Sequence, residues 1–267
     1  MGLVLLLLLA AFFLLWTGVL LILRASGSPT RDGIGRALAQ GRPTEPGQLG
    51  FEVESWTLTT ADGLDLPGWT ITTGVDGPTV VWLHDWSRSQ LGLLPRLDAW
   101  AAWCGRIVTV DLRGHGDAPG ACSLGLAESD DLRLLLERHV DGPVVLAGEG
   151  LGAVLAINAV ASGVIEPLGV FALDPFVHGS ERFRAALRES GYHVFPAADL
   201  ALIMLWLRDR SPVDLSWPAS PGVPVLARFT DEGADTLREH VPNTASLRIE
   251  TCDETGLDDA GRVDAPW

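Results

Sequence analysis

The hydrophobic and polar positions divide the chain into an apolar N-terminal run and a longer, mixed body. Residues 2–23 contain no charged side chain. As a helix rising about 1.5 Å per residue, this run would be roughly 33 Å long, enough to cross the hydrocarbon core of a bilayer. We therefore predict that residues 1–24 form a transmembrane anchor. The alternative is a cleaved signal peptide, which the small residues after Arg24 favour but the length and the uncharged start of the run do not.

The body begins with alternating apolar and polar residues, which predict a β-hairpin over residues 51–72. The alternation loses its parity at Ser55 and Gly68, which predicts an imperfect register with a bulge at the first break. A short apolar run at residues 79–83 is typical of a buried parallel strand. Similar runs cover residues 107–110, 144–147, 169–173, 223–227 and 246–249. Helical stretches separate these runs, at residues 89–104, 126–140, 151–162, 180–190, 198–208 and 232–240.

This alternation of strands and helices predicts an α/β fold with a doubly wound, mostly parallel sheet over residues 51–267. Residues 25–50 are rich in Gly, Pro and Arg, and we expect them to form a linker between the anchor and this domain. The apolar stretch 200–207 is expected to pack in the core of the domain. Contact of that stretch with lipid beside the anchor is the alternative.

Charge limits the partners that this chain can bind. The sequence has 34 acidic and 19 basic residues, a formal net charge of −15, and every basic residue is Arg. The absence of Lys excludes Schiff-base and P-loop lysine chemistry. The acidic body would repel phosphate backbones, so we expect no binding to nucleic acid. The three cysteines follow no disulfide or zinc-binding pattern, and no cofactor is expected.

The basic residues near the apolar run predict its orientation. Four arginines follow the run and only the terminal amine precedes it; they are Arg24, Arg31, Arg36 and Arg42. By the positive-inside rule, the protein is expected to be a single-pass membrane protein with its globular domain in the cytoplasm. The membrane, contacted through residues 2–23, is therefore its first expected partner.

Three motifs follow three of the predicted strands in a familiar order. Residues 84–86 read His-Asp-Trp, residues 111–117 read Asp-Leu-Arg-Gly-His-Gly-Asp, and residues 148–152 read Gly-Glu-Gly-Leu-Gly. In this order and spacing, they resemble the oxyanion loop, the D-x-R-G-x-G turn and the nucleophile elbow of the α/β-hydrolase superfamily. The resemblance covers residues 51–267. The branch that it resembles most is that of lysophospholipases and monoglyceride lipases, which includes forms with one N-terminal membrane span.

The resemblance implies a catalytic triad, and two of its positions depart from the family pattern. Gly150 stands where the family carries its nucleophile, and glycine has no side chain to attack a carbonyl carbon. A shift of register that makes Glu149 the nucleophile is rejected, because it places Leu151 where a small residue is needed. Glu254 stands at the position of the base, and no His follows His240.

The remaining site positions give a mixed picture. A carboxylate at the acid position is expected to persist as Asp231 or Asp235, but without an imidazole it has nothing to orient. Asp85 replaces the usual glycine of the oxyanion loop, where a negative charge would repel the developing oxyanion, and Glu149 would add a second charge. These two residues, with their neighbours, are expected to line the pocket; the set is His84, Asp85, Trp86, Glu149 and Leu151.

Several of these residues also have a purely structural interpretation. His84 and His115 are expected to be hydrogen-bonded packing residues, and Arg113 is expected to tie its turn together through backbone carbonyls. Carboxylates from Asp85, Glu149 and the C-terminal strands could converge on a divalent cation, but they have no diagnostic spacing, and we expect no metal site.

These departures favour a membrane-anchored pseudoenzyme with a reduced cap at about residues 175–220. It would bind a small acyl-type ligand or a protein partner. One alternative is an active carboxylic-ester, thioester or amide hydrolase with a non-standard site. Another is a structural membrane protein.

Overall fold

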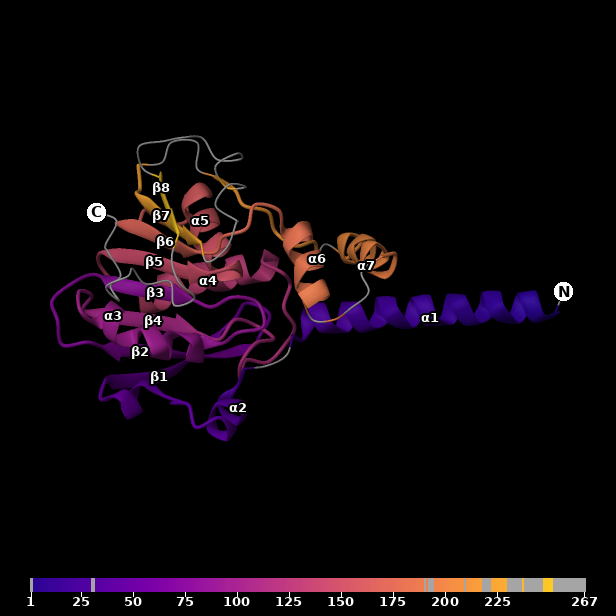
Figure 1. The fold of residues 1–267 in the computed structure, drawn as a ribbon. Helices are drawn as coiled ribbons and strands as arrows, with labels where there is room; N and C mark the ends of the chain where they lie inside the picture. The colour runs from indigo at the N-terminus through magenta and orange to yellow at the C-terminus, as the bar shows by residue number, and fades with distance from the viewer. Residues whose placement is uncertain are drawn as a thin grey trace.

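Residues 2–29, 32–189, 191, 195–208, 210–217, 222–229, 237 and 247–251 are described by a computed structural model of the chain. Within them, one eight-stranded sheet has the order β1-β2-β4-β3-β5-β6-β7-β8, and strands from β3 onward are parallel. The strands are β1 (Glu52–Thr59), β2 (Asp65–Thr72), β3 (Thr79–Leu83), β4 (Arg106–Val110), β5 (Val144–Glu149), β6 (Gly169–Leu173), β7 (Val225–Phe229) and β8 (Leu247–Thr251). The predicted α/β fold with a mostly parallel sheet is confirmed (Figure 1).

The N-terminal hairpin has a more regular register than the sequence predicts. β1 and β2 pair antiparallel without interruption from Glu52–Thr72 to Thr59–Asp65, so the expected bulge at Ser55 is wrong. The break in parity at Gly68 has a packing cause instead. The Trp56 ring covers Gly68, whose absent Cβ would lie 2.1 Å from a ring carbon of Trp56.

Helices cover both faces of the sheet, and two hydrophobic clusters lie between the layers. The helices after the hairpin are η2 (Gln90–Arg96), α3 (Leu97–Ala101), α4 (Leu126–His139), α5 (Leu151–Ala161), α6 (Gly179–Glu189) and α7 (Ala197–Trp206). Alternate residues of β3 face opposite clusters: Val80 and Trp82 pack with η2 and α3, while Val81 and Leu83 pack with α4 and α5. This two-sided burial explains why the strand is uniformly apolar.

Two of the predicted helices need comment. Residues 89–104 were expected to form one helix, but they form the 3₁₀ helix η2 followed by the short α3. Pro95 lies inside η2 and lacks the N–H that a regular α-helix would use there. The expected helix at 232–240 lies outside the described residues, apart from Leu237.

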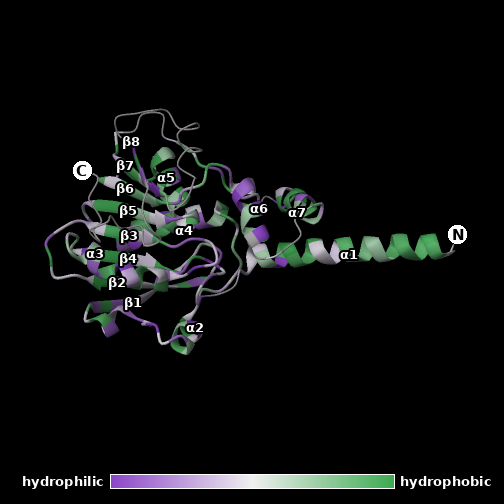
Figure 2. Cartoon of the chain, in the orientation of Figure 1, coloured by the Kyte–Doolittle hydropathy of each residue, from purple (hydrophilic) through white to green (hydrophobic). Residues whose placement is uncertain are grey.

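The N-terminal apolar run forms one long helix, α1 (Gly2–Gly27). It is long and apolar enough to cross a membrane, a property that signal sequences share. Figure 2 shows it as hydrophobic along most of its length, projecting from the body. Its last turns differ from the rest, because Val19 and Ile22 are buried against the body. The predicted linker region contains two short helices, α2 (Ile34–Ala39) and η1 (Pro46–Leu49).

The apolar stretch 200–207 lies only in part in the hydrophobic core, to which Ala201 and Leu205 belong. It belongs to α7, which packs beside α1 at one end of the body (Figure 1). Ile203, Trp206 and Leu207 are exposed on its outer side. The expectation of a core helix therefore holds for one side of α7 only. The sequence could not show this, because part of the apolar surface that α7 covers belongs to α1 rather than to the sheet.

In the turn after β4, the Arg113 side chain bonds carboxylates rather than the expected backbone carbonyls. Arg113 is buried and donates to both carboxylate oxygens of Asp131, at 2.7 Å each. It also donates to Asp62, at 2.9 and 3.2 Å. His115 is fully buried in the same turn, which confirms a packing role. The bidentate geometry of a guanidinium suits this fastening of three segments that are remote in sequence.

Candidate functional site

The strand-to-helix turn between β5 and α5 has the backbone of a nucleophile elbow. Gly150 lies at its tip with φ +51° and ψ −111°, a conformation that residues with a Cβ adopt only under strain. Its N–H donates to the carbonyl of Leu173 at the end of β6, and its carbonyl accepts from Val154 in the first turn of α5. The elbow is therefore fully formed although no side chain stands on it.

The carboxylate of Asp85 fills the place that a side chain at Gly150 would occupy. A Cβ built on Gly150 would lie 1.9 Å from Asp85 Oδ1. The same oxygen accepts a hydrogen bond of 2.7 Å from the backbone N–H of Leu151. The two departures from the family pattern are thus spatially reciprocal, because the room left by the missing side chain on the elbow is taken by the carboxylate from the loop after β3.

This carboxylate occupies the oxyanion hole itself. In the hydrolase fold, that hole is formed by the N–H after the nucleophile and by an N–H from the loop after β3. Here the corresponding N–H groups are that of Leu151, which donates to Asp85 Oδ1 at 2.7 Å, and that of Trp86, which lowers the pKa of the same carboxyl group. The sequence predicts that Asp85 repels an oxyanion. In the structure, Asp85 also engages the Leu151 N–H, a donor that an oxyanion would need.

The pKa of the Asp85 carboxyl group is raised above its usual value. Burial is the largest cause, and the Arg182 guanidinium and the two backbone N–H groups oppose it. Arg182 reaches it from α6, with Nη2 3.6 Å from Oδ2. Glu149 adds a second negative charge beside it, as expected, and this charge also raises the pKa of Asp85. Glu149 itself forms an ion pair of 3.3 Å with Arg96.

His84 lies beneath the site as a structural residue. It is fully buried, accepts a hydrogen bond from the Leu112 N–H at Nε2, and contacts the Asp85 carbonyl oxygen through Nδ1 at 2.8 Å. Burial and the neighbouring His115 lower its pKa to about 3. A neutral imidazole with both nitrogens engaged cannot accept a proton at neutral pH, so the structural interpretation is confirmed.

The low pKa of His84 predicts acid-sensitive stability. The group ionises near pH 6.5 when unfolded but only near pH 3 when folded, so its contribution is complete above pH 6.5 and is lost as the pH falls. From pH 6.5 downward, each pH unit should cost up to about 1.4 kcal/mol. We expect His84→Gln to have a flatter stability profile between pH 7 and 5 than the unmodified protein, measured by thermal unfolding in one detergent.

The matched control for this experiment is His139→Gln. His139 is less buried, although burial also lowers its pKa, so its replacement should flatten the profile less than His84→Gln does. If stability falls equally steeply with pH in the unmodified protein and in His84→Gln, the acid sensitivity does not come from this imidazole.

A small cavity of about 40 Å³ lies between the elbow and α6. Its walls are mostly apolar, with one ion pair; they are formed by Asp85, Trp86, Leu124, Leu151, Phe176, Gly179, Arg182, Phe183, Ala186 and Pro212. No histidine is among these residues. At roughly 10–15 Å³ for each water, the cavity has room for about three water molecules.

The cavity lies close to the end of α1. The Trp86 indole N–H donates to the Ser26 carbonyl at 3.4 Å, and the Gly27 carbonyl accepts from the Cys122 N–H at 2.8 Å. The final turn of the apolar helix thus supports the loop after β3, on which Asp85 and Trp86 stand.

Several residues predicted from the sequence do meet at this site. His84, Asp85, Trp86, Gly150 and Leu151 are brought together, whereas the Glu149 side chain pairs with η2. The acid candidates Asp231 and Asp235 and the base position Glu254 lie outside the described residues. Within the described part of the chain, no group of three His, Cys, Asp or Glu side chains could hold a metal ion.

Arg182 is the site residue that the sequence analysis missed. It lies on α6, inside the predicted cap, and pairs with Asp85 across the cavity. No motif marks it, because one arginine on a charged helix resembles any solvated arginine. Only the docking of α6 against the elbow brings the two charges together.

The parallel sheet, the formed elbow and the loop after β3 define an α/β-hydrolase fold. In agreement, residues 80–264 match the sequence model described as the alpha/beta hydrolase family. The chain belongs to this family. A search of curated proteins finds no significant match.

Solved structures confirm the fold at low sequence identity. An esterase from Pyrococcus furiosus superposes with a TM-score of 0.58 at 20% identity, covering 78% of this chain and 85% of the esterase. A bacterial membrane phospholipase A has a TM-score of 0.55 at 16% identity, covering 94% of this chain and 89% of the phospholipase. Alpha/beta hydrolase domain-containing protein 10 from mouse has a TM-score of 0.54 at 13% identity, covering 74% and 88%.

Proposed function

We propose that this protein is a membrane-anchored, non-hydrolytic member of the alpha/beta hydrolase family that acts by binding. The observation that carries the proposal is the position of Asp85. Its carboxylate takes the oxyanion-hole N–H of Leu151 at 2.7 Å and fills the space above Gly150. Acyl transfer needs a nucleophile and free donors for the oxyanion at this point, and neither is provided here.

The end of α1 supports its retention as an anchor. Val19 and Ile22 are almost completely buried, and the Ser26 carbonyl accepts from Trp86. Cleavage of α1 as a leader would remove these contacts. It would also expose the alanines of α7, which share a hydrophobic cluster with Val19 and Ile22. The arginines that follow the helix favour a body on the cytoplasmic side. The similarity to a membrane phospholipase A extends over nearly the whole chain, which is compatible with an anchored form.

The cavity limits what the former active site could bind. Its apolar lining and single ion pair suit a small acyl-type ligand with a polar head. A volume of about 40 Å³ admits only a short acyl group unless α6 moves away from the elbow. A protein partner at the body surface is the second candidate, and the small size of the cavity is the observation that favours it.

Turnover measurements test the non-hydrolytic assignment. We expect the full chain in detergent micelles to hydrolyse a panel of esters, thioesters and amides no faster than buffer, and to resist labelling by a fluorophosphonate probe. Asp85→Asn should behave in the same way, with Asp76→Asn at an exposed loop as the matched control. Turnover that Asp85→Asn abolishes and Asp76→Asn preserves would overturn the proposal and make Asp85 a catalytic residue.

A ligand arm in the same experiment separates the two binding roles. Methyl butyrate should raise the melting temperature of the full chain if the cavity takes short acyl groups. Ala186→Phe would fill the cavity and should remove that shift, whereas Ala185→Phe, on the same helix but outside the lining, should retain it. No shift in any of the three proteins would favour the protein partner or a structural role.

A further inference from the structure

The outer side of α7 carries an apolar surface that the body does not cover. Ile203, Trp206 and Leu207 are 53%, 66% and 68% exposed. The opposite side of the helix is buried, and it carries Ala197, Ala198, Ala201 and Leu205. Positions 197, 201 and 205 follow one another at helical spacing, so they form one face. α7 thus turns three alanines and Leu205 inward, and it turns Ile203 and Trp206 outward.

The buried face of α7 lies against α1. A Cβ on Gly18 would stand 3.5 Å from the Ala197 Cβ, and Val19 and Ile22 belong to the same cluster as the alanines of α7. Small residues on both helices allow their backbones to approach closely. The exposed apolar residues of α7 therefore stand on a helix that packs against α1, whose Leu14 and Leu20 are 71% and 60% exposed.

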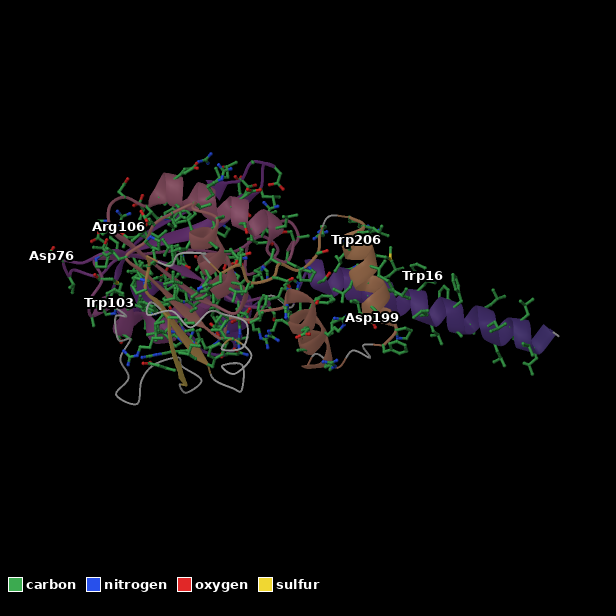
Figure 3. All side chains as sticks on the ribbon, turned by 90° about the horizontal axis from the view of Figure 1, so that it is seen from above. Trp16, Asp76, Trp103, Arg106, Asp199 and Trp206 are labelled. Carbon is green, nitrogen blue, oxygen red and sulfur yellow. The ribbon has the colours of Figure 1, made fainter. Side chains whose placement is uncertain are left out.

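The direction of α7 suits the plane of a membrane. In Figure 1 the helix is seen nearly end-on, and in Figure 3, turned by 90°, it runs across α1. An α1 that stands across a bilayer would therefore place α7 along one surface of it, on the side of the body. Trp16 and Trp206 lie near this crossing (Figure 3). Tryptophan is enriched where the acyl region meets the head groups.

The one acidic residue in the regular part of α7, Asp199, stands four and seven positions before Ile203 and Trp206 and therefore on the same side of the helix. Its charge is paired with Arg184 of α6 at 2.8 Å. Arg208 follows the helix and is exposed, as expected for a residue that reaches anionic head groups.

From the packing on α1, the crosswise direction and the outward apolar residues, we propose that α7 lies in the bilayer interface as a second membrane contact. The occupant of its outer face is lipid. This inference rests on the proposed function only in so far as α1 is retained in the membrane. Its consequence concerns the former active site, because α6 lines the cavity and is tied to α7 through Arg184 and Asp199. The cavity would thus be held at the membrane surface.

Spin-label accessibility tests the position of α7 in the full chain. The protein would carry Cys252→Ser, since Cys104 and Cys122 are buried and do not compete for the label. Single labels would be placed through Trp206→Cys on α7, Phe13→Cys on α1 and Asp76→Cys on the remote loop. The samples are vesicles of phosphatidylcholine and phosphatidylglycerol, and the measurement compares collisions with oxygen and with a water-soluble nickel chelate.

We expect the label at position 206 to collide more with oxygen than with nickel, as the label at position 13 does, and the label at position 76 to show the reverse. If the label at position 206 collides more with the nickel chelate while the label at position 13 collides more with oxygen, the inference is overturned and the anchor stands. If both labels collide more with the nickel chelate, the anchor is overturned as well. Spin–spin broadening at 206 would identify a second copy instead of lipid and would also overturn the inference. Leu207→Cys repeats the test if Trp206→Cys folds poorly.

Discussion

Replacing Gly150 with serine should destabilise the protein by about 4 kcal/mol and should create no hydrolase. Part of the cost is backbone strain, because a residue with a Cβ at φ +51° is unfavourable by roughly 1–3 kcal/mol. The rest comes from Asp85, whose Oδ1 lies 1.9 Å from the new Cβ and would lose its hydrogen bond to Leu151, worth about 1.5–3 kcal/mol. For a protein of this size, the melting temperature should fall by roughly 10 °C.

Two further variants separate these causes. Gly142 has a φ of +76° with open space around the missing Cβ, so Gly142→Ser measures strain without collision and should cost the smaller amount. The double variant Gly150→Ser with Asp85→Gly removes the collision and should be more stable than Gly150→Ser alone. Neither Gly150→Ser nor the double variant should hydrolyse esters, because no described residue lining the cavity is a histidine. Additive costs in the double variant would contradict the reciprocal fit of Asp85 and Gly150.

Replacing Arg113 with methionine should cost about 3–5 kcal/mol, because it leaves a buried carboxylate without a partner. The Asp131 side chain is only 3% exposed and receives two hydrogen bonds of 2.7 Å from Arg113. Thermal unfolding in detergent measures the loss. The matched control is Arg133→Met, which removes an exposed ion pair with Glu137 on the same helix as Asp131. That change should cost less than about 0.5 kcal/mol.

A second replacement and a pH series sharpen the result. Arg113→Met with Asp131→Leu should recover part of the loss, since an apolar pair replaces a buried ion pair at little cost. The Arg113 guanidinium lowers the pKa of Asp62 to about 2, so the stabilisation by this pair is present above pH 3.8 and is lost as the pH falls toward 2. If Arg113→Met lowers the stability no more than Arg133→Met does, Arg113 does not fasten the turn as assigned.

Local patterns were enough to predict most of the fold. Strands such as β3 are short apolar runs because both faces are buried, and this leaves a direct mark on the sequence. The glycines around position 150 mark the elbow, since only that sharp turn between strand and helix requires them. The charge-free run of α1 is equally visible. Pro95 shows the limit of such patterns, because one missing N–H changed an expected α-helix into η2.

The sequence by itself therefore determined the α/β fold, the long apolar helix and the glycine at the tip of the elbow, because each depends on neighbouring residues. The tertiary structure decided which groups stand around that glycine. Asp85 reaches the oxyanion hole across 66 positions of sequence separation, and Arg182 meets it only after α6 docks. The tertiary structure also decided that α7 packs on α1. Such contacts follow from how elements pack in space, and a pattern of apolar and polar residues does not record which surface will cover which.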